Sequence, residues 1–393
     1  MRVLIIPSEH FLTDRQPLGG IFQFDQAEAL IDAGHQVHVL SVGFISPRYL
    51  LKKYPYRVTE CHGSLFVRRK YRRALFIERY LSQKLNARRY LALFKREYEK
   101  YYLEFGNPDV VHAHNFLYAG YLAEWLKDNY GVPYLITEHS SSFAKKRTSD
   151  HDILELNRVG SKAGTVSCVS FSFKKMLENI LGLQFEVLPN LAKKIFFSDY
   201  GIDFKRDKFT FLTIASLDHN KNQAHLIRAF AKAFKGRGVC LRIGGTGSLF
   251  SKLLTLTEEL GVSDQIIFLG SLSRADVVTE MQMANCFVLS SQYETFGVVL
   301  IEALASGLPL IATKCGGPED IVNTDNGILV DVGCVEQLTA ALRYMTNHVA
   351  KYDRETLRDE AYKCYSARVF VKKVTNLYEH IIENNSSSRC QYR

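Results

Sequence analysis

The stretch QYETFGVVLIEALASGLPLIATKCGGPED, residues 292–320, decides the fold class of the chain around it. It follows the apolar, β-rich run CFVLS (286–290), which predicts a buried strand of a parallel sheet. Glu294 comes directly after that strand, at the carboxyl end where open α/β sheets bind their ligands. A second acid, Glu302, follows Glu294 after seven intervening residues. The pair therefore points to a ligand-binding site rather than to two solvated side chains.

The segment FGVVLIEALASG predicts a helix from Phe296 to Gly307. Its first amides, those of Phe296, Gly297 and Val298, would be free to bind an anion such as phosphate. Glu302 lies about two turns along this helix, which is apolar nearly all round. A lone Glu on a helix is usually solvated, but an unpaired Glu buried among apolar residues costs free energy. We therefore expect Glu302 to contact a ligand.

The rest of the chain repeats the alternation of apolar strands and helical patterns in two series. One series ends near residue 190, and the other begins at FTFLTIAS, which predicts parallel sheets covered by helices on both faces. We predict an α/β fold of two doubly wound Rossmann-like domains, 1–190 and 209–366, with a linker at 191–208. A further helix is predicted at about 367–384, before a frayed tail.

The net charge of +9 favours anionic partners, and the basic excess is concentrated in residues 67–100, with 12 basic and 3 acidic residues. Arginines alternate there with aromatic and aliphatic residues at roughly helical spacing, which predicts a basic amphipathic helix. It could contact an anionic membrane surface or pack on the domain with its arginines solvated. No recognised nucleic-acid module accompanies the charge, so we expect no nucleic-acid partner.

Eight cysteines include no CxxC pair, and several fall inside apolar strand-like runs. They indicate reduced core residues of a cytoplasmic protein rather than a disulfide or zinc framework. The apolar run at the amino terminus is too short for a signal peptide, and no segment is long enough to span a bilayer. We expect a cytoplasmic protein, with peripheral association at the inner face of the plasma membrane as the alternative.

Other polar residues follow strands of the first domain. Gly20 precedes a helix after the first strand, where a glycine permits close approach of a ligand. His114 and His139 end two further strands. A lone strand histidine is most often structural, and no carboxylate or cysteine at ligand spacing supports a metal. Asp150 and Asp152 form an Asp-x-Asp, but they precede a helical run, where Ser149 or Asp150 serves as the cap. We therefore predict no metal and no cofactor.

In the second half, ASLDHNKNQ (215–223) follows a strand and begins a helix. Lys221 in this loop can place a positive charge beside a diphosphate. The run CLRIGGTGSLF has Gly245 and Gly247 after a strand but lacks the third glycine of a dinucleotide fingerprint. This favours a nucleotide held more loosely than NAD and argues against an oxidoreductase.

The Glu, seven residues, Glu pattern, followed by GGPED (316–320), resembles the signature of family 4 of the retaining nucleotide-sugar glycosyltransferases, which have two facing Rossmann-like domains in the GT-B architecture. The resemblance covers nearly the whole chain, and it implies that the two domains face each other across an interdomain cleft and that the helix at about 367–384 crosses back to the first domain. It implies that the second domain binds a UDP- or GDP-sugar as co-substrate and that the first binds a saccharide acceptor, lipid-linked in one version of the hypothesis. The reaction would retain the anomeric configuration without a metal and would serve bacterial surface polysaccharide biosynthesis.

The resemblance also implies roles for single residues. His139, with His114 as second choice, would contact the transferred sugar or its diphosphate, Lys221 would stabilise the leaving group, Glu294 would orient sugar hydroxyls and Glu302 would hold the ribose. The remaining donor-binding positions are Gly20, Ser216, Gly245, Gly247, Phe296 and Gly297. Ser216 stands where the family usually has an arginine, so one of two positive charges is missing.

Two alternatives to a transferase are kept, and the first of them has the same two-domain build. A sugar-nucleotide epimerase would need no acceptor, and release of free nucleotide separates it from a transferase. A non-catalytic protein that binds sugars or a membrane surface would show no turnover at all.

Overall fold

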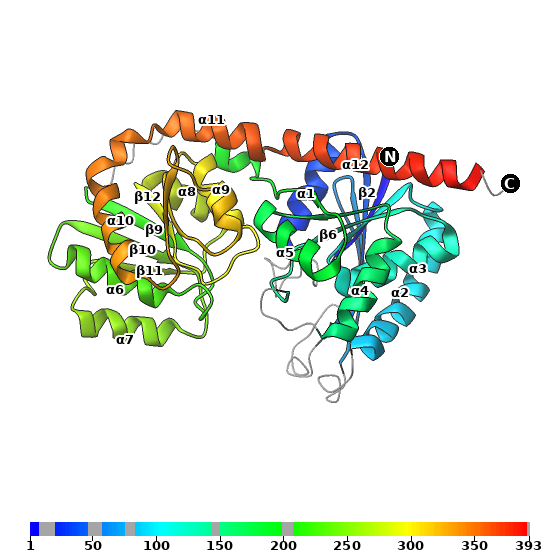
Figure 1. The fold of residues 1–393 in the computed structure, drawn as a ribbon, viewed down its shortest axis with the longest axis horizontal. Coiled ribbons are helices and arrows are strands. Elements are labelled where there is room, and N and C mark those ends of the chain that lie inside the picture. Colours follow the sequence, from blue (N-terminus) through cyan, green and yellow to red (C-terminus); the bar gives the residue numbers. More distant parts are fainter. Residues whose placement is uncertain (8–19, 46–56, 75–82, 144–148, 199–206, 391–393) are drawn as a thin grey trace. The chain divides into compact units, whose positions relative to one another are not determined.

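The computed structural model describes residues 1–7, 20–45, 57–74, 83–143, 149–198 and 207–390. The chain forms two compact units (Figure 1). Unit 1 comprises Met1–Asn190 together with Arg368–Arg393, and unit 2 comprises Leu191–Ala367. In each unit, helices alternate with the strands of a mostly parallel sheet, which is the two-domain α/β fold expected from the sequence.

Unit 1 contains an eight-stranded sheet with the order β3-β4-β2-β1-β5-β6-β7-β8. All pairings are parallel except that of β3 with β4. Because β2 and β5 lie on opposite sides of β1, the chain order reverses between β1 and β5. The strands are β1 (Arg2–Ile6), β2 (Gln36–Ile45), β3 (Arg57–His62), β4 (Leu65–Arg73), β5 (Val110–His114), β6 (Tyr134–Glu138), β7 (Thr165–Cys168) and β8 (Glu186–Val187).

The helices of unit 1 pack on this sheet, and the last of them comes from the far end of the chain. Val374, Tyr378 and Ile381 on α12 recur every three to four residues and are buried. A Cβ at Gly164 would lie 2.5 Å from Ile381, so α12 packs closely against the first part of the chain. The helices are α1 (Ile21–Asp32), α2 (Gln83–Phe105), α3 (Tyr121–Tyr130), α4 (Asp150–Ser161), α5 (Phe171–Leu181), α12 (Ala367–Cys390) and the short π-helix η3 (Phe116–Gly120).

Unit 2 contains a six-stranded parallel sheet with the order β11-β10-β9-β12-β13-β14. Its chain order reverses between β9 and β12. Both β12 and β13 are buried along their whole length, which explains their continuous apolar sequences. The strands are β9 (Phe209–Ile214), β10 (Val239–Gly244), β11 (Ile266–Gly270), β12 (Cys286–Leu289), β13 (Leu310–Thr313) and β14 (Gly327–Val330).

Helices follow the strands of unit 2 in turn. A core of buried side chains from α6, α7 and α10 packs on the sheet, with Phe230 and Leu342 among its fully buried members. The α-helices are α6 (Gln223–Phe234), α7 (Phe250–Leu260), α8 (Arg274–Met283), α9 (Val298–Ala305), α10 (Val335–His348) and α11 (Arg354–Tyr365). The short 3₁₀ helices are η4 (Lys194–Phe197), η5 (Gly317–Asp320) and η6 (Val349–Lys351).

The basic segment 67–100 is not one amphipathic helix, and that prediction was wrong. Its first part lies in β4, and only its later part lies in α2, while residues 75–82 lie outside the described part of the chain. The side chains of Arg68 and Arg69 are buried. Arg68 donates to Glu104 at 2.6 Å, and Arg69 forms an ion pair with Glu60. These two arginines are therefore bound within unit 1 and are not available to a membrane.

Two smaller expectations also change. The helix expected from Phe296 begins at Val298, because Gly297 has a φ of 99° and acts as its cap. The final helix does not fray after residue 384 but continues to Cys390. The linker expected at 191–208 includes η4, and its residues 199–206 lie outside the described part of the chain.

Candidate active site

Lys221 and Glu294 meet at the point of unit 2 where the chain order reverses. Lys221 lies in the loop after β9 and Glu294 in the loop after β12, and these two strands are neighbours. The Lys221 ammonium donates to Glu294 Oε1 at 2.5 Å, and the Ser291 hydroxyl donates to the same oxygen at 2.6 Å. The carboxyl end of a sheet at such a reversal is where α/β proteins bind nucleotides. Two residues predicted separately thus form one ion pair at that position.

Hydrogen bonds to backbone carbonyls hold the two loops in place. The amide of Gln292 donates to the Asn220 carbonyl at 2.7 Å, and the side chain of Asn220 donates to the Tyr293 carbonyl at 3.0 Å. The hydroxyl of Thr313, at the end of β13, donates to the Ser291 carbonyl at 2.6 Å. The ion pair therefore lies on loops whose positions are fixed by their neighbours, as a preorganised binding site requires.

Ser216, at the position of the missing arginine, has a local structural role. Its hydroxyl donates to Asp218 Oδ2 at 2.7 Å, while Asp218 Oδ1 accepts from the amides of Asn220 and Lys221. Burial acts to raise the pKa of Asp218, but these hydrogen bonds outweigh it and hold the pKa below its ordinary value. The ionised Asp218 thus fixes the backbone that carries Lys221.

The glycines of the neighbouring loop have a packing role in addition to the predicted one. A Cβ at Gly245 would lie 1.9 Å from the Ala215 carbonyl oxygen, and one at Gly247 would lie 2.3 Å from that of Leu217. The Leu217 amide donates to the Thr246 carbonyl at 2.9 Å. Only glycine lets the loop after β10 approach the loop after β9 this closely. Contact of Gly245 and Gly247 with a donor stays a prediction.

The amino end of α9 follows Glu294 by four residues in the sequence. Leu300 donates to the Gly297 carbonyl at 2.9 Å, whereas no described group accepts a hydrogen bond from the amides of Phe296, Gly297 or Val298. Phe296 is 3% exposed as a whole residue, so its ring is packed inside unit 2 and is not presented to a ligand. Three free amides at a helix amino end can bind an anion.

Glu302 is not an unpaired buried acid. Its carboxylate lies 3.5 Å from the Arg274 guanidinium at the start of α8, so the argument from an unpaired charge was wrong. The Glu302 side chain is 13% exposed and can still present an oxygen to a ligand. Sequence reasoning missed Arg274 because the run SLSRAD marks only a helix start, capped by Ser273.

In unit 1, three histidines lie together: His112 and His114 on β5, and His139 directly after β6. His114 Nδ1 lies 3.0 Å from His139 Nε2, so one proton is shared between the two predicted residues. His112 stacks on His114 with 4.3 Å between ring centroids. Its nitrogens lie 2.7 Å from the Tyr378 hydroxyl and 2.7 Å from the Thr137 hydroxyl. His112 is therefore a satisfied structural histidine, and α12 contributes to holding the cluster.

Burial keeps these imidazoles neutral. It lowers the pKa of His112 and of His139 to about 3, and it lowers the pKa of His114 in the same direction. Burial also raises the pKa of Glu138 to about 7, although the amides of Phe116, Ser140 and His139 donate to its carboxylate. Neutral imidazoles can donate or accept hydrogen bonds, but they offer no positive charge to a diphosphate. That charge must come from another group such as Lys221.

Gly20 lies where the sequence places it, at the start of α1. It has a φ of 71°, and its carbonyl accepts from Phe24 at 3.0 Å. Residues 8–19 of the preceding loop lie outside the described part of the chain. The Asp-x-Asp pair lies at the start of α4, where Ser149 and Asp152 form a reciprocal cap. In the described ranges, no cluster of His, Cys, Asp or Glu could hold a metal ion.

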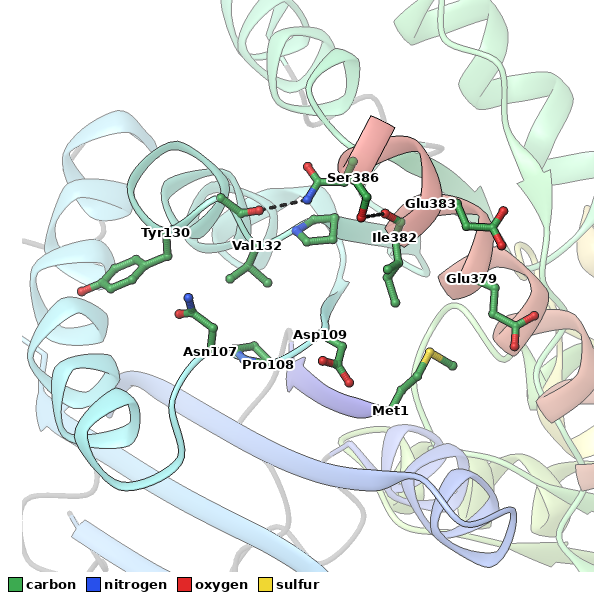
Figure 2. A pocket seen from close by; sticks show the side chains of 13 residues that line it. Met1, Asn107, Pro108, Asp109, Tyr130, Val132, Glu379, Ile382, Glu383 and Ser386 are labelled. Carbon is green, nitrogen blue, oxygen red and sulfur yellow. Dashed lines mark hydrogen bonds between the residues drawn. The ribbon is translucent and has the colours of Figure 1, made fainter. Parts of the chain in front are cut away.

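A cavity of about 450 Å³ in unit 1 is not part of this site (Figure 2). Its wall includes Met1, Asp109 and Pro133, which precede β1, β5 and β6, together with Ile382 of α12. It therefore lies at the amino ends of the strands, on the opposite edge of the sheet from His114. Ligands of open α/β sheets bind at the carboxyl ends.

Two family models match successive parts of the chain. The model described as Glycosyltransferase Family 4 matches residues 20–191, and the model described as Glycosyl transferases group 1 matches residues 199–363. An uncharacterised glycosyltransferase of Methanocaldococcus jannaschii is 24% identical over 91% of this chain and 93% of the relative. The N-acetyl-alpha-D-glucosaminyl L-malate synthase of Bacillus anthracis is 25% identical over 94% of this chain and 96% of the relative.

Solved structures show the same fold. The sucrose-phosphate synthase of Thermosynechococcus elongatus matches with a TM-score of 0.79 and 18% identity, over 98% of this chain and 100% of that chain. Anabaena HepE in complex with UDP matches with a TM-score of 0.73 and 16% identity, over 96% of this chain and 99% of that chain. None of the described helices has the length and apolar character that a membrane crossing requires. The two matched models and the shared two-domain fold establish that the chain is a glycosyltransferase and belongs to family 4, with the GT-B architecture.

Proposed function

We propose that this protein transfers a sugar from a UDP- or GDP-sugar to a hydroxyl of a saccharide acceptor, with retention of the anomeric configuration and without a metal. The observation that carries the proposal is the Lys221–Glu294 ion pair at the chain reversal of unit 2, next to the free amides before α9. The Anabaena neighbour was solved in complex with UDP and glucose, which supports a nucleotide donor.

The donor diphosphate would bind Lys221 and the amides at Phe296 and Gly297. Binding exchanges the Lys221–Glu294 contact for a contact between Lys221 and phosphate, which frees Glu294 to accept hydrogen bonds from sugar hydroxyls. As the bond between the anomeric carbon and the leaving oxygen breaks, negative charge grows on the diphosphate. A fixed ammonium and fixed amides stabilise that charge without reorganising. Glu302 would accept hydrogen bonds from the ribose.

Retention follows from attack on the same face that the leaving group departs from. The acceptor oxygen bonds to the anomeric carbon, the bond to the β-phosphate breaks, and the acceptor proton passes to an oxygen of the departing phosphate. His139 supports the reacting sugar as a neutral hydrogen-bonding group, which its low pKa permits. The role of His139 and that of His114 rest on family resemblance.

The acceptor would be a lipid-linked precursor of a bacterial surface polysaccharide, presented at an anionic membrane surface. Since Arg68 and Arg69 are buried, the contacts would come from exposed residues such as Arg72, Arg73 and Arg96. Each cation near such a surface contributes about 1 kcal/mol. Replacing these three residues with Glu should abolish co-sedimentation with anionic vesicles at low salt. An equal affinity for neutral vesicles would contradict this part of the proposal.

The function is tested by incubating the protein with a panel of UDP- and GDP-sugars and candidate acceptors in excess EDTA. We expect release of nucleoside diphosphate together with a glycoside whose anomeric configuration, determined by NMR, equals that of the donor. The Lys221→Ala variant should lower kcat and kcat/KM together, on the order of 100-fold. An inverted product or activity that requires added manganese would refute the mechanism, and epimerised donor without transfer would favour an epimerase.

A further inference from the structure

A second cavity in unit 1 lies among α2, α3 and α4 and has a volume of about 260 Å³. This volume is close to the lower limit of small-molecule sites, roughly 300 Å³. Tyr121 follows His114 by seven residues and begins α3, and Asp152 lies in the first turn of α4, which follows β6. The lining of the cavity therefore runs along α3 and α4, from their first turns, which follow β5 and β6, to Asp128 and Arg158 in their later turns.

Each helix contributes residues from one face. On α3, Tyr121, Trp125 and Asp128 are three to four residues apart, and on α4 the same spacing joins Asp152 and Glu155. The lining thus combines aromatic rings with carboxylates. Four carboxylates and two guanidinium groups contribute, so negative charge prevails in the lining itself.

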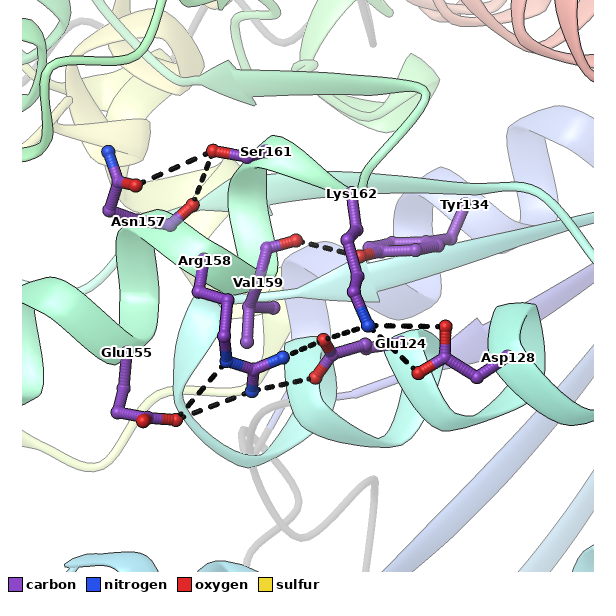
Figure 3. A network of polar contacts seen from close by, with 9 residues as sticks. All are labelled: Glu124, Asp128, Tyr134, Glu155, Asn157, Arg158, Val159, Ser161 and Lys162. Carbon is purple, nitrogen blue, oxygen red and sulfur yellow. Dashed lines mark hydrogen bonds and ion pairs between the residues drawn. The ribbon is translucent and has the colours of Figure 1, made fainter.

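One wall of the cavity is fixed by ion pairs (Figure 3). Arg158 contacts both oxygens of the buried Glu124 and lies 3.3 Å from Glu155. Lys162 donates to Glu124 at 3.0 Å and to Asp128 at 3.0 Å. Glu124, Asp128 and Glu155 are therefore held in place by protein cations, and the described residues here provide no metal site. A wall held in this way is preorganised for hydrogen bonding.

The other lining groups have unused hydrogen-bonding capacity. Arg88 on α2 is exposed and makes no ion pair or hydrogen bond with any described residue. Within the same described ranges, the Tyr121 hydroxyl and the Trp125 indole N–H have no hydrogen-bond partner. Burial and the carboxylates of Glu155 and Asp152 raise the pKa of Tyr121 to about 12, so its hydroxyl keeps its proton and can donate.

These groups match an uncharged sugar. Carboxylates accept hydrogen bonds from hydroxyls, a guanidinium donates to ring and hydroxyl oxygens, and aromatic rings cover the apolar C–H face of a pyranose. An anionic sugar would meet an excess of carboxylates, which disfavours it. A small cavity that combines two aromatic rings with fixed charges is therefore better suited to one sugar unit than to a peptide or a lipid chain.

We propose that the cavity among α2, α3 and α4 is a saccharide subsite that binds a neutral sugar unit of the acceptor, away from the sugar that receives the transfer. The inference rests on the proposed function, because it takes the acceptor to be a saccharide longer than one unit. It adds Arg88, Tyr121, Trp125 and Glu155 as residues that determine which acceptor is bound.

Trp125 makes the test direct, because it is the only tryptophan in the chain. Tryptophan emission is measured while the full-length protein, without nucleotide, is titrated with the methyl glycosides of glucose, galactose, mannose and N-acetylglucosamine. We expect a saturable change for at least one of them, and a weaker response to glucuronic acid. Because Trp125→Phe has no tryptophan emission, binding to that variant is measured by ligand-detected NMR, and we expect it to persist because phenylalanine keeps an aromatic ring.

Arg88→Ala and Glu155→Gln should each weaken binding about tenfold, since each removes a hydrogen bond that involves a charged group. Arg228→Ala is the control, because Arg228 is an exposed arginine of α6 in unit 2 that does not line the cavity. No response to any of the sugars would overturn the proposal, as would a response that is equally strong in Arg88→Ala and in Glu155→Gln.

The link to catalysis is tested separately. With an acceptor oligosaccharide that the wild-type protein glycosylates, Arg88→Ala should raise the KM for acceptor about tenfold and leave kcat and the KM for donor unchanged. An unchanged KM for acceptor would refute the acceptor role. Lack of transfer by the wild-type protein would instead refute the proposed function, and it would leave the binding result standing because that assay contains no donor.

Discussion

At the scale of residues, the main result is that Lys221 and Glu294, which are far apart in sequence, form one ion pair. Glu302 was expected to be unpaired, but its carboxylate lies 3.5 Å from the Arg274 guanidinium. A partner at that distance leaves room for a second contact, since a carboxylate accepts several hydrogen bonds. A measurement of nucleotide affinity therefore decides whether Glu302 also contacts the ligand.

Glu302→Gln should weaken the binding of nucleoside diphosphate about tenfold, because an amide accepts hydrogen bonds from ribose hydroxyls less strongly than a carboxylate does. Calorimetric titration of UDP and GDP measures the effect. Glu336→Gln is the control, since Glu336 also pairs with a cation, Lys232, at 3.0 Å but on exposed helix surfaces. If affinity is unchanged and only stability falls, Glu302 stabilises the fold and does not bind the nucleotide.

The buried histidines predict a dependence of stability on pH. Burial lowers the pKa of His112 to about 3, so between that value and its ordinary 6.5 the unfolded chain binds more protons than the folded one. The free energy of unfolding therefore falls as the pH drops below 6.5, by up to about 1.4 kcal/mol per pH unit for one such group. Glu138, whose pKa is raised to about 7, acts in the opposite direction in the same range.

Removing the histidine should remove its share of that dependence. Urea denaturation measures the free energy of unfolding at about pH 6.5 and at about pH 5. Between these two pH values, the free energy of unfolding of His112→Asn should fall by about 1 to 2 kcal/mol less than that of the wild-type protein. His380→Asn, at an exposed position on α12, should behave like the wild type. Equal losses for His112→Asn and the wild type would show that His112 is protonated in the folded state.

At the scale of elements, strands buried on both faces are predicted well from sequence, because short continuous apolar runs such as β12 and β13 are typical of such strands. The sequence predicts a helix over part of β4 because Arg68 and Arg69 interrupt the apolar pattern of that strand. Both arginines are buried, and their charges are compensated by ion pairs with Glu104 and Glu60, which lie elsewhere in the sequence. The polar edge strand β3 (Arg57–His62) was missed for a similar reason, since its residues alternate only between partly and fully exposed.

The candidate site was likewise predictable only in part. Its loops could be located from strand ends and glycines, but the partners of each side chain could not. Asn220 and Ser291, which hold the two loops and Glu294 in place, give no signal in a single sequence because Asn and Ser are common in any loop. Arg274 is likewise recognised only once α8 and α9 are placed side by side.

The close approach of two loops gives a prediction at this scale. Gly247→Ala places a Cβ 2.3 Å from the Leu217 carbonyl oxygen, and the resulting displacement should lower the free energy of unfolding by about 1 to 3 kcal/mol. Gly238→Ala is the matched control, because no atom lies within 4 Å of its added Cβ and the effect should stay within about 0.5 kcal/mol. Chemical denaturation compares the two, and equal stabilities would show that the loops can separate without cost.

At the scale of the whole molecule, each unit has the reversal of chain order that creates a ligand site in α/β proteins. In unit 1 the polar groups identified near that reversal are neutral histidines, and in unit 2 they are an ammonium, a carboxylate and free amides. This difference supports the proposal that unit 2 binds the charged, diphosphate-bearing donor and that unit 1 binds a neutral acceptor. The C-terminal helix α12 belongs to unit 1, where Tyr378 holds His112.

The central claim is that unit 2 binds the donor diphosphate through Lys221. It is tested most directly by calorimetric titration of UDP and GDP into the wild-type protein, Lys221→Ala and the control Lys232→Ala, a lysine of α6 that pairs with Glu336 on the surface. We predict that one of the two nucleotides binds the wild type and the control equally, and binds Lys221→Ala at least about tenfold more weakly. Binding that is unaffected by Lys221→Ala, or no binding of either nucleotide to the wild type, would contradict it.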